Sequence, residues 1–173
     1  MNLEDELRQL DPLLELEPAQ DQEPEPALPE TQYCIFRAGQ ERFCFSVMDV
    51  EEVVEWPALT RIPLAPSFLM GVFNLRGAIV PVVDIAFTEA RRPDLQPRHI
   101  VVAKLKKQAE NEDVRIGVAA DEVIGTFSTA EPLLADQAPL EVPHCCGLVR
   151  YEDRMALALD LQKLTEAFAV PVI

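Results

Sequence analysis

Two histidines and four cysteines are the residues best suited to nucleophilic chemistry. His144 directly precedes Cys145 and Cys146, so a base stands beside two thiols, as Cys/His catalysis requires. Neighbours in an extended chain point to opposite faces, however, and a nucleophile normally meets its base across the fold. We therefore favour a loop thiol and a surface histidine over a small Cys/His enzyme.

Three aspartates could support acid–base catalysis or a Mg²⁺ site. Asp84, Asp121 and Asp160 each fall at or near the end of an expected strand, where Asp commonly accepts hydrogen bonds from turn amides. The sequence has no G-x-S-x-G run, P-loop or dinucleotide fingerprint. We expect no catalytic residue, and an Asp-dependent enzyme is the less favoured alternative.

The cysteine spacing argues against a metal or a redox site. Cys34 and Cys44 are ten residues apart, and the other two are adjacent, so no pair has the C-x-x-C spacing of zinc sites. Cysteines in strand-like runs usually pack as small apolar residues. We expect no metal and no cofactor.

A charged side chain beside a tight turn is the stronger candidate. Arg76 lies in the run Asn74-Leu75-Arg76-Gly77, between two apolar segments, and its planar head with five donors suits a fixed bridge or the recognition of a partner. Glu52 lies in an apolar run and could pair with it. The alternative is an ordinary surface arginine, and the residue types alone do not decide between the two.

Alternating apolar runs predict a mainly β domain after an acidic tail. Residues 1–32 hold ten acids and one base, a net charge of −9 out of −15 for the chain. Leucines 3, 7, 10 and 14 could form one helical stripe that docks on a partner, folds back or frays. The prolines of 17–32 predict a disordered linker.

The expected elements after the tail are short. They are strands over 33–38, 42–47, 71–76, 78–85, 99–106 and 114–120, with a continuation over 121–125, and a last hairpin of strands 147–150 and 154–161. A helical turn leading into a strand is expected over 48–55, short helices after Pro66 and over 161–168, and a turn at Gly77. Pro81 within a strand predicts an edge or a bulge.

The two halves of the domain have similar sequence patterns. Gly71 and Asp84 stand thirteen residues apart around a predicted hairpin, and so do Gly147 and Asp160. This weak repeat predicts two small β subdomains of about five strands each, packed together. Their junction is a natural groove for a ligand or a partner.

Composition narrows the partners. A net charge of −15 disfavours nucleic acid and anionic lipid. The first ten residues are polar and acidic, unlike a signal peptide, and the longest apolar run is far shorter than the ~18 residues of a membrane span. We expect a cytoplasmic protein without membrane insertion.

Several runs, in order and at compatible spacings, closely resemble the CheW-like domain over about 33–167. They are Val50-Glu51-Glu52-Val53, Thr60-Arg61-Ile62-Pro63, Ala65-Pro66-Ser67-Phe68-Leu69-Met70-Gly71, Asn74-Leu75-Arg76-Gly77, Ile79-Val80-Pro81-Val82-Val83-Asp84, Ile116-Gly117-Val118 and Asp121-Glu122-Val123.

The resemblance implies two small five-stranded, SH3-like β-barrel subdomains, approximately 33–90 and 95–167, with possible strand exchange. It also implies a non-enzymatic adaptor that couples the cytoplasmic tip of methyl-accepting chemoreceptors to the regulatory domain of a CheA-type histidine kinase. A coupling protein of another array, for motility or surface sensing, is the alternative.

By motif match, the resemblance also implies the residues of the site. It gives Arg76 the family's signature arginine, Glu52 as its salt-bridge partner, and Val50, Val53 and Asn74 as residues near the partner surface. Gly71, Gly77 and Asp84 are expected to shape turns.

Overall fold

The computed structural model describes residues 27–86, 96–106 and 113–168. The leucine stripe and most of the predicted acidic linker lie outside these ranges. Strand β1 (Thr31–Ala38) begins inside the predicted tail, so the folded domain starts two residues earlier than expected.

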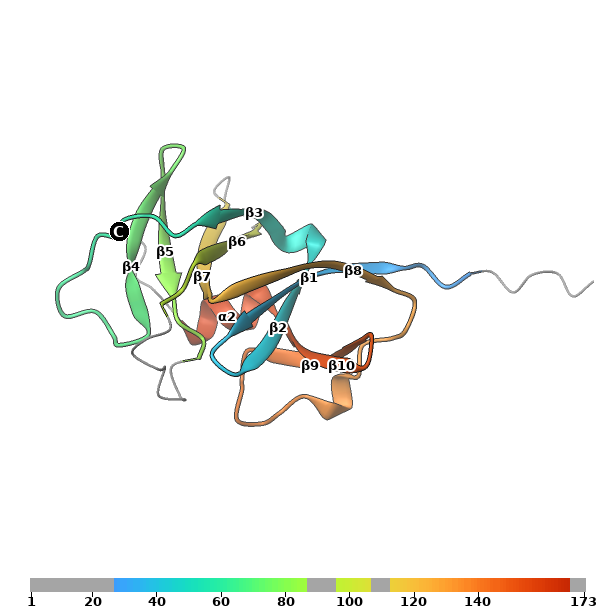
Figure 1. Ribbon diagram of the computed structural model, residues 1–173. Helices are drawn as coiled ribbons and strands as arrows, with labels where there is room; N and C mark the ends of the chain where they lie inside the picture. The colour runs from blue at the N-terminus through green and yellow to red at the C-terminus, as the bar shows by residue number, and fades with distance from the viewer. Residues whose placement is uncertain (1–26, 87–95, 107–112, 169–173) are drawn as a thin grey trace, which may run out of the picture.

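The described chain is mainly β, as expected (Figure 1). Its remaining elements are β2 (Glu41–Ser46), η2 (Val47–Asp49), β3 (Val50–Glu55), β4 (Leu69–Leu75), β5 (Ala78–Val83), β6 (His99–Leu105), β7 (Val114–Ala120), β8 (Glu122–Thr129), η3 (Ala135–Gln137), β9 (Cys145–Tyr151), β10 (Arg154–Leu159) and α2 (Leu161–Ala167).

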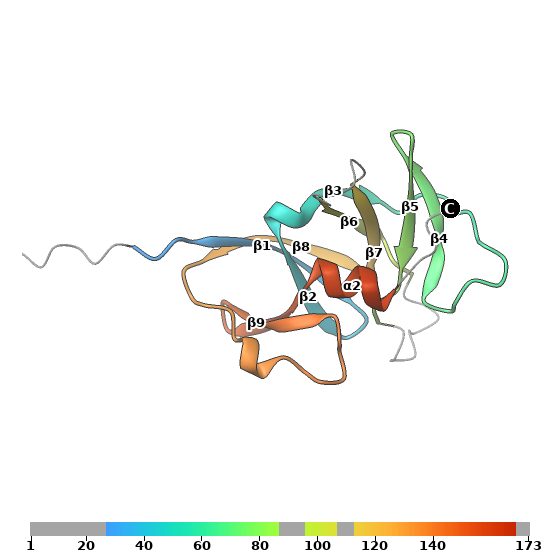
Figure 2. The same cartoon turned by 180° about the vertical axis from the view of Figure 1, so that it is seen from behind.

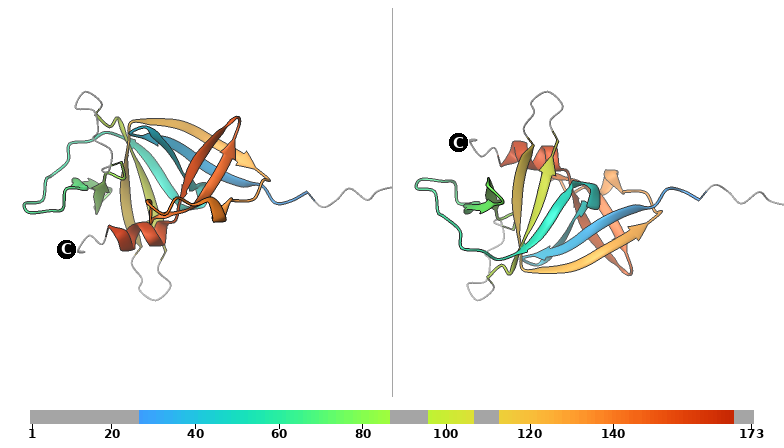
Figure 3. Two further views of the ribbon diagram at one scale, coloured as in Figure 1. Left: turned by 90° about the horizontal axis from the view of Figure 1, so that it is seen from below. Right: turned by 90° about the horizontal axis from the view of Figure 1, so that it is seen from above.

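The strands form two five-stranded sheets, which confirms the predicted fold class. Sheet A has the order β8-β1-β2-β10-β9, and sheet B has the order β3-β6-β7-β5-β4. The two sheets lie side by side in the views of Figure 3. In each sheet, one parallel pair (β2 with β10, β5 with β7) joins two antiparallel groups.

The halves of the chain exchange strands between the sheets. Sheet A joins β1 and β2 to β8, β9 and β10, whereas sheet B joins β3, β4 and β5 to β6 and β7. The predicted division near 90–95 therefore does not separate the two sheets. When β1–β5 are matched in order with β6, β7, β8, β9 and β10, both sheets have the same strand order, so the sequence repeat is a structural one.

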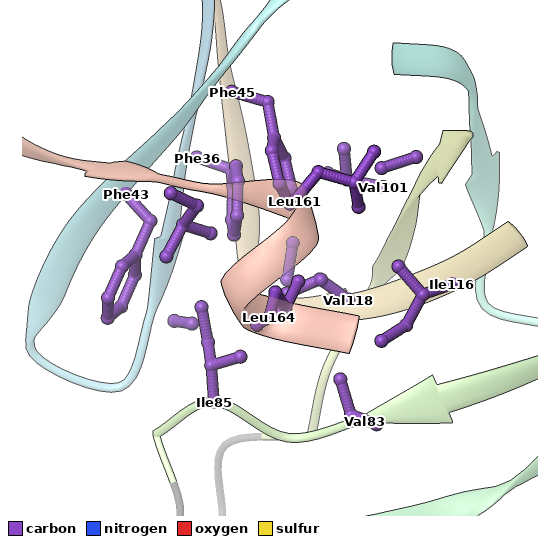
Figure 4. Packing of buried hydrophobic residues seen from close by; sticks show 14 of the residues in the cluster. Phe36, Phe43, Phe45, Val83, Ile85, Val101, Ile116, Val118, Leu161 and Leu164 are labelled. Carbon is purple, nitrogen blue, oxygen red and sulfur yellow. The ribbon is translucent and has the colours of Figure 1, made fainter. Parts of the chain in front are cut away.

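Each sheet curls around an apolar cluster to which all five of its strands contribute. A third and larger cluster lies between the sheets and takes residues from both (Figure 4). In β2, Phe43 and Phe45 face this shared core, while Cys44 faces the inner cluster of sheet A. The side chains of β2 therefore alternate as expected, but both faces of the strand are buried.

The C-terminal helix closes the junction of the two sheets, as Figure 2 shows from behind. Leu161 and Leu164 of α2 are buried in the shared core. The side chain of Asp160 accepts a hydrogen bond from the Lys163 N–H at 3.0 Å, so Asp160 is the N-cap of this helix.

Two local predictions were wrong. No helix follows Pro66, because this segment makes only turns before β4 begins at Leu69. Strand β5 is not an edge strand, since it lies between β7 and β4, and the bulge of the β4–β5 pair falls on β4 opposite Val82 and Val83, not at Pro81. The parallel ladder of β5 with β7 comprises only Val82 and Val83. Pro81 lies just before this ladder, and its missing N–H limits how far the pairing with β7 extends.

Removing an aromatic ring from the shared core should destabilise the whole domain. Phe45 is fully buried and stacks on Phe36 with ring centroids 6.0 Å apart. Phe45→Ala is expected to lower the free energy of unfolding by about 3–5 kcal/mol, measured by urea denaturation. Met48→Ala is the control, because Met48 is 90% exposed; equal losses for both variants would contradict this description of the core.

Candidate functional site

The tip of the β4–β5 hairpin presents the candidate arginine. Arg76 and Gly77 form the two-residue turn with φ values of 51° and 91°, as in the type I′ turns that match the twist of hairpins. The Asn74 side chain accepts a hydrogen bond from the Gly77 N–H at 2.8 Å. Gly77 is therefore a turn residue, as expected, and Asn74 stabilises the turn.

Arg76 reaches from this tip to β3. Its Nη2 donates to Glu52 Oε2 at 3.1 Å, so the structure contains the ion pair that the sequence suggested. The Arg76 side chain is 79% exposed, and that of Glu52 is 24% exposed. Most of the guanidinium thus faces solvent, whereas the carboxylate is fixed against the protein.

A β-bulge in β3 brings a second glutamate to the same place. Val50 pairs with Ala103 and Glu52 with Val102, which leaves Glu51 as the extra residue. A bulge breaks the alternation of side chains and re-aims them, so consecutive glutamates line one surface. Glu51 accepts two hydrogen bonds from Arg115 on β7, from Nε at 2.6 Å and from Nη2 at 3.1 Å.

Sequence reasoning missed the Glu51–Arg115 pair. In a regular strand, Glu51 and Glu52 would point to opposite faces. They lie on one side here because the bulge interrupts the alternation. The hydrogen bonds from Arg115 lower the pKa of Glu51, and those to Glu51 raise the pKa of Arg115. Both groups are therefore charged at neutral pH.

The four charged side chains surround a pocket of about 330 Å³. Its lining residues are Glu51, Glu52, Leu75, Arg76, Gly77, Ala78 and Arg115. This lining set contains no thiol, hydroxyl or imidazole. Fixed charges of both signs beside a small apolar floor can recognise a charged or amphipathic group of a partner, but they supply no nucleophile.

The other predicted contact residues flank the ion pair on β3. Val50 is half-buried and packs against the shared core, so its role in the fold is partly structural. Val53 is 38% exposed and pairs with Val101 of β6. Val53 follows Glu52 in the regular part of the strand and pairs with Val101 of the shared core, so it lies on the opposite face of β3 from Glu52.

Sheet A repeats the bulge and the two-residue hairpin loop of this site, but not its cluster of paired charges. The extra residue of the β8 bulge is Ile124, followed by Gly125, and the position of Arg76 in the matching hairpin is taken by Glu152, also with positive φ, at 48°. Of the four charged residues, only Arg115 has an equivalent of the same type in sheet A, which is Arg42. The fold therefore builds this backbone without the charge cluster.

Comparisons with known proteins agree with this architecture. A sequence model described as the CheW-like domain matches residues 32–169. The chain belongs to the CheW-like domain family. A probable chemotaxis protein CheW of Rhizobium etli is 30% identical over 131 residues, with 75% of this chain and 83% of that protein covered. The chemotaxis protein CheW of Thermotoga maritima is 31% identical over 147 residues, with 83% and 93% covered.

A solved structure shows the same fold. The scaffolding protein TtCheW from Thermoanaerobacter tengcongensis superposes with a TM-score of 0.65 at 22% identity, covering 77% of this chain and 86% of that one. As a member of the CheW-like family, this chain is a non-enzymatic scaffold of chemotaxis signalling. Among the described residues, no helix has both the length and the apolar character that crossing a bilayer requires.

The geometry around His144 suits this non-enzymatic character. Cys145 and Cys146 donate their S–H groups to the carbonyls of Gly147 and Ala158, at 3.1 and 3.5 Å. Burial raises the pKa of both thiols and lowers that of His144. A thiol held in its neutral form is a poor nucleophile. His144 is buried against Phe168, not on the surface as we expected.

The aspartates have structural partners. Asp84 Oδ1 accepts a hydrogen bond from the Ala86 N–H at 3.0 Å, and Asp121 Oδ2 accepts one from the Gly39 N–H at 2.7 Å. Within the ranges that the structure describes, no three His, Cys, Asp or Glu side chains are grouped to hold a metal ion.

Gly71 has a role that differs from the predicted one. It lies inside β4, not in a turn, and its φ is 148°. A Cβ there would stand 2.7 Å from the Thr60 carbonyl oxygen. Glycine is required at this position because the segment around Thr60 pairs closely with β4 through Val72.

The Glu51–Arg115 pair should be visible in a titration. Because the folded pKa of Glu51 is lowered, its stabilising contribution is present above the ordinary value of about 4.3 and is lost as the pH falls through the folded pKa. Carboxyl NMR should therefore find a titration midpoint below the ordinary value, and Arg115→Gln should raise it. A midpoint that is the same in both proteins would contradict the pairing.

Proposed function

We propose that this CheW-like protein couples methyl-accepting chemoreceptors to a CheA-type histidine kinase. It binds the cytoplasmic tip of the receptor and the regulatory domain of the kinase, and works in the cytoplasm at membrane-bound arrays. The observation that carries this proposal is the charge cluster of sheet B, which is placed on a backbone that sheet A builds without it.

The energetics of the Glu52–Arg76 pair favour recognition over stability. An ion pair with one partner as exposed as Arg76 contributes only ~0–1 kcal/mol to folding. Its geometry is nevertheless held by the Arg76–Gly77 turn and the bulge. A fixed, exposed charge pair serves to orient a partner and to exclude partners of the wrong charge.

The surroundings of the pair resemble part of a protein interface. Only Nη2 of Arg76 is bonded to Glu52, so the rest of the guanidinium can meet a carboxylate or a carbonyl of a partner. Leu75 and Ala78 of the hairpin add apolar surface to the lining of the same pocket. Charged groups beside apolar side chains are typical of docking surfaces that bind without chemistry.

Reversing the charge of Arg76 tests the proposal. Arg76→Glu places two carboxylates together, so it should weaken binding to the receptor tip or to the kinase regulatory domain by about tenfold or more. Binding is measured by calorimetry with each purified fragment, and circular dichroism should show an unchanged fold.

Arg154→Glu is the matched control. Arg154 is exposed and follows the equivalent turn in the β9–β10 hairpin, so this variant makes the same charge change on the other sheet. We expect it to bind both fragments normally. If Arg76→Glu also bound both fragments with unchanged affinity, the site assignment would be wrong.

A further inference from the structure

The charge cluster of sheet B could be paired in two ways. Glu51 and Glu52 are consecutive, and both face the guanidinium groups of Arg76 and Arg115 across one pocket. Arg76 also contributes to lowering the pKa of Glu51, so it lies within electrostatic reach of both carboxylates. Arg76 could therefore pair with either glutamate, and the question is why it pairs with Glu52 and not with Glu51.

Arg76 pairs with Glu52 because Arg115 already binds Glu51. Two parallel N–H donors hold this carboxylate at 2.6 and 3.1 Å, and two-pronged contacts of this kind are stronger and more directional than single ones. The side chains of Arg115 and Glu51 are 26% and 24% exposed, against 79% for Arg76. Arg76 makes only one contact, at 3.1 Å, so Arg115 occupies Glu51 and leaves Glu52 to Arg76.

A nearby lysine does not replace Arg115. Lys104 is opposite Arg115 on β6, but its ammonium group pairs with Asp113 at 3.0 Å. Lys104 and, to a smaller extent, Arg76 also lower the pKa of Glu51. Because Lys104 is paired with Asp113, Arg76 is the next guanidinium for a Glu51 released from Arg115. Conversely, Arg115 released from Glu51 would have two carboxylates nearby. One is Glu52 on the pocket wall, and the other is Asp113, which already raises the pKa of Arg115 but is paired with Lys104 at 3.0 Å.

The fold itself does not require the Glu51–Arg115 pair. Sheet A forms the same bulge around Ile124, which has no charge. Arg42, at the position equivalent to Arg115, has a buried Nε without a hydrogen-bond partner in the described structure. The bulge therefore forms without a bridge from this arginine to the bulged residue, although Arg37 and Glu122 pair at 3.5 Å elsewhere on the two strands β1 and β8. The bridge in sheet B thus has another role.

We propose that Arg115 is a positioning residue for the Glu52–Arg76 pair, and that Glu51 and Arg115 keep each other from competing for it. Arg115 holds Glu51 away from Arg76, and Glu51 holds Arg115 away from Glu52. The effect of this on partner binding rests on the proposed function, because it assumes that the Glu52–Arg76 pair meets the partner.

Three variants distinguish positioning from direct contact. Arg115→Gln frees Glu51 to compete for Arg76, and Glu51→Gln frees Arg115 to compete for Glu52. Each single variant should weaken binding to the receptor or kinase fragment by about fivefold. The double variant contains neither competitor, so it should bind within about twofold of the wild type, a strong non-additivity of the kind expected for neighbours.

A second measurement needs no partner. The side-chain N–H signals of Arg76 in the free, full-length protein report how firmly its guanidinium is held. NMR should show faster side-chain exchange in each single variant and a return toward the wild-type rate in the double variant. This readout tests the positioning role even if neither fragment binds, so its failure is separate from a failure of the proposed function.

Arg42→Gln is the matched control, since Arg42 occupies the same strand position in sheet A. It should leave the Arg76 signals and both affinities unchanged. Additive losses in the double variant would show that Glu51 and Arg115 touch the partner themselves, and would overturn the proposal. Unchanged Arg76 signals in both single variants would also overturn it.

Discussion

The apolar layer between the sheets is the interaction on which the rest of the molecule depends. Phe36, Phe43 and Phe45 stack with ring centroids about 6 Å apart and meet side chains of sheet B and α2 in one cluster. The central strands bury both faces, one in this layer and one in the inner cluster of their own sheet. Neither sheet can therefore be removed without exposing a large apolar surface on the other.

This dependence explains why the backbone is so similar in the two sheets while the charges differ. Strand order, bulge and hairpin turn are set by packing that both halves must satisfy. The charged groups around the pocket lie outside the core, so they were free to differ between the halves. A site that departs from its own structural repeat is a stronger indication of function than exposure or charge alone.

The sequence predicted where most strands lie along the chain, because their side chains alternate locally. It predicted the turn at Gly77 because glycine adopts positive φ, and the repeat because the spacings of the two halves match. It did not predict which strands pair, since β1 meets β8 across about 90 residues and periodicity carries no information about such partners. The bulge at Glu51 was missed for the same reason, because an extra residue is defined only relative to β6. Gly71 was misassigned because its restriction comes from a carbonyl eleven residues earlier.

The exchange of strands also determines how the two sheets are connected. The chain crosses from sheet A to sheet B through η2, and it returns through the single residue Asp121 between β7 and β8. Asp121 is held by its N–H to the Arg37 carbonyl at 2.8 Å and by the Gly39 N–H at 2.7 Å. Two covalent crossings and a shared core leave no hinge at this junction. A force applied at the β4–β5 tip would thus be passed to sheet A through the shared core and through both crossings of the chain.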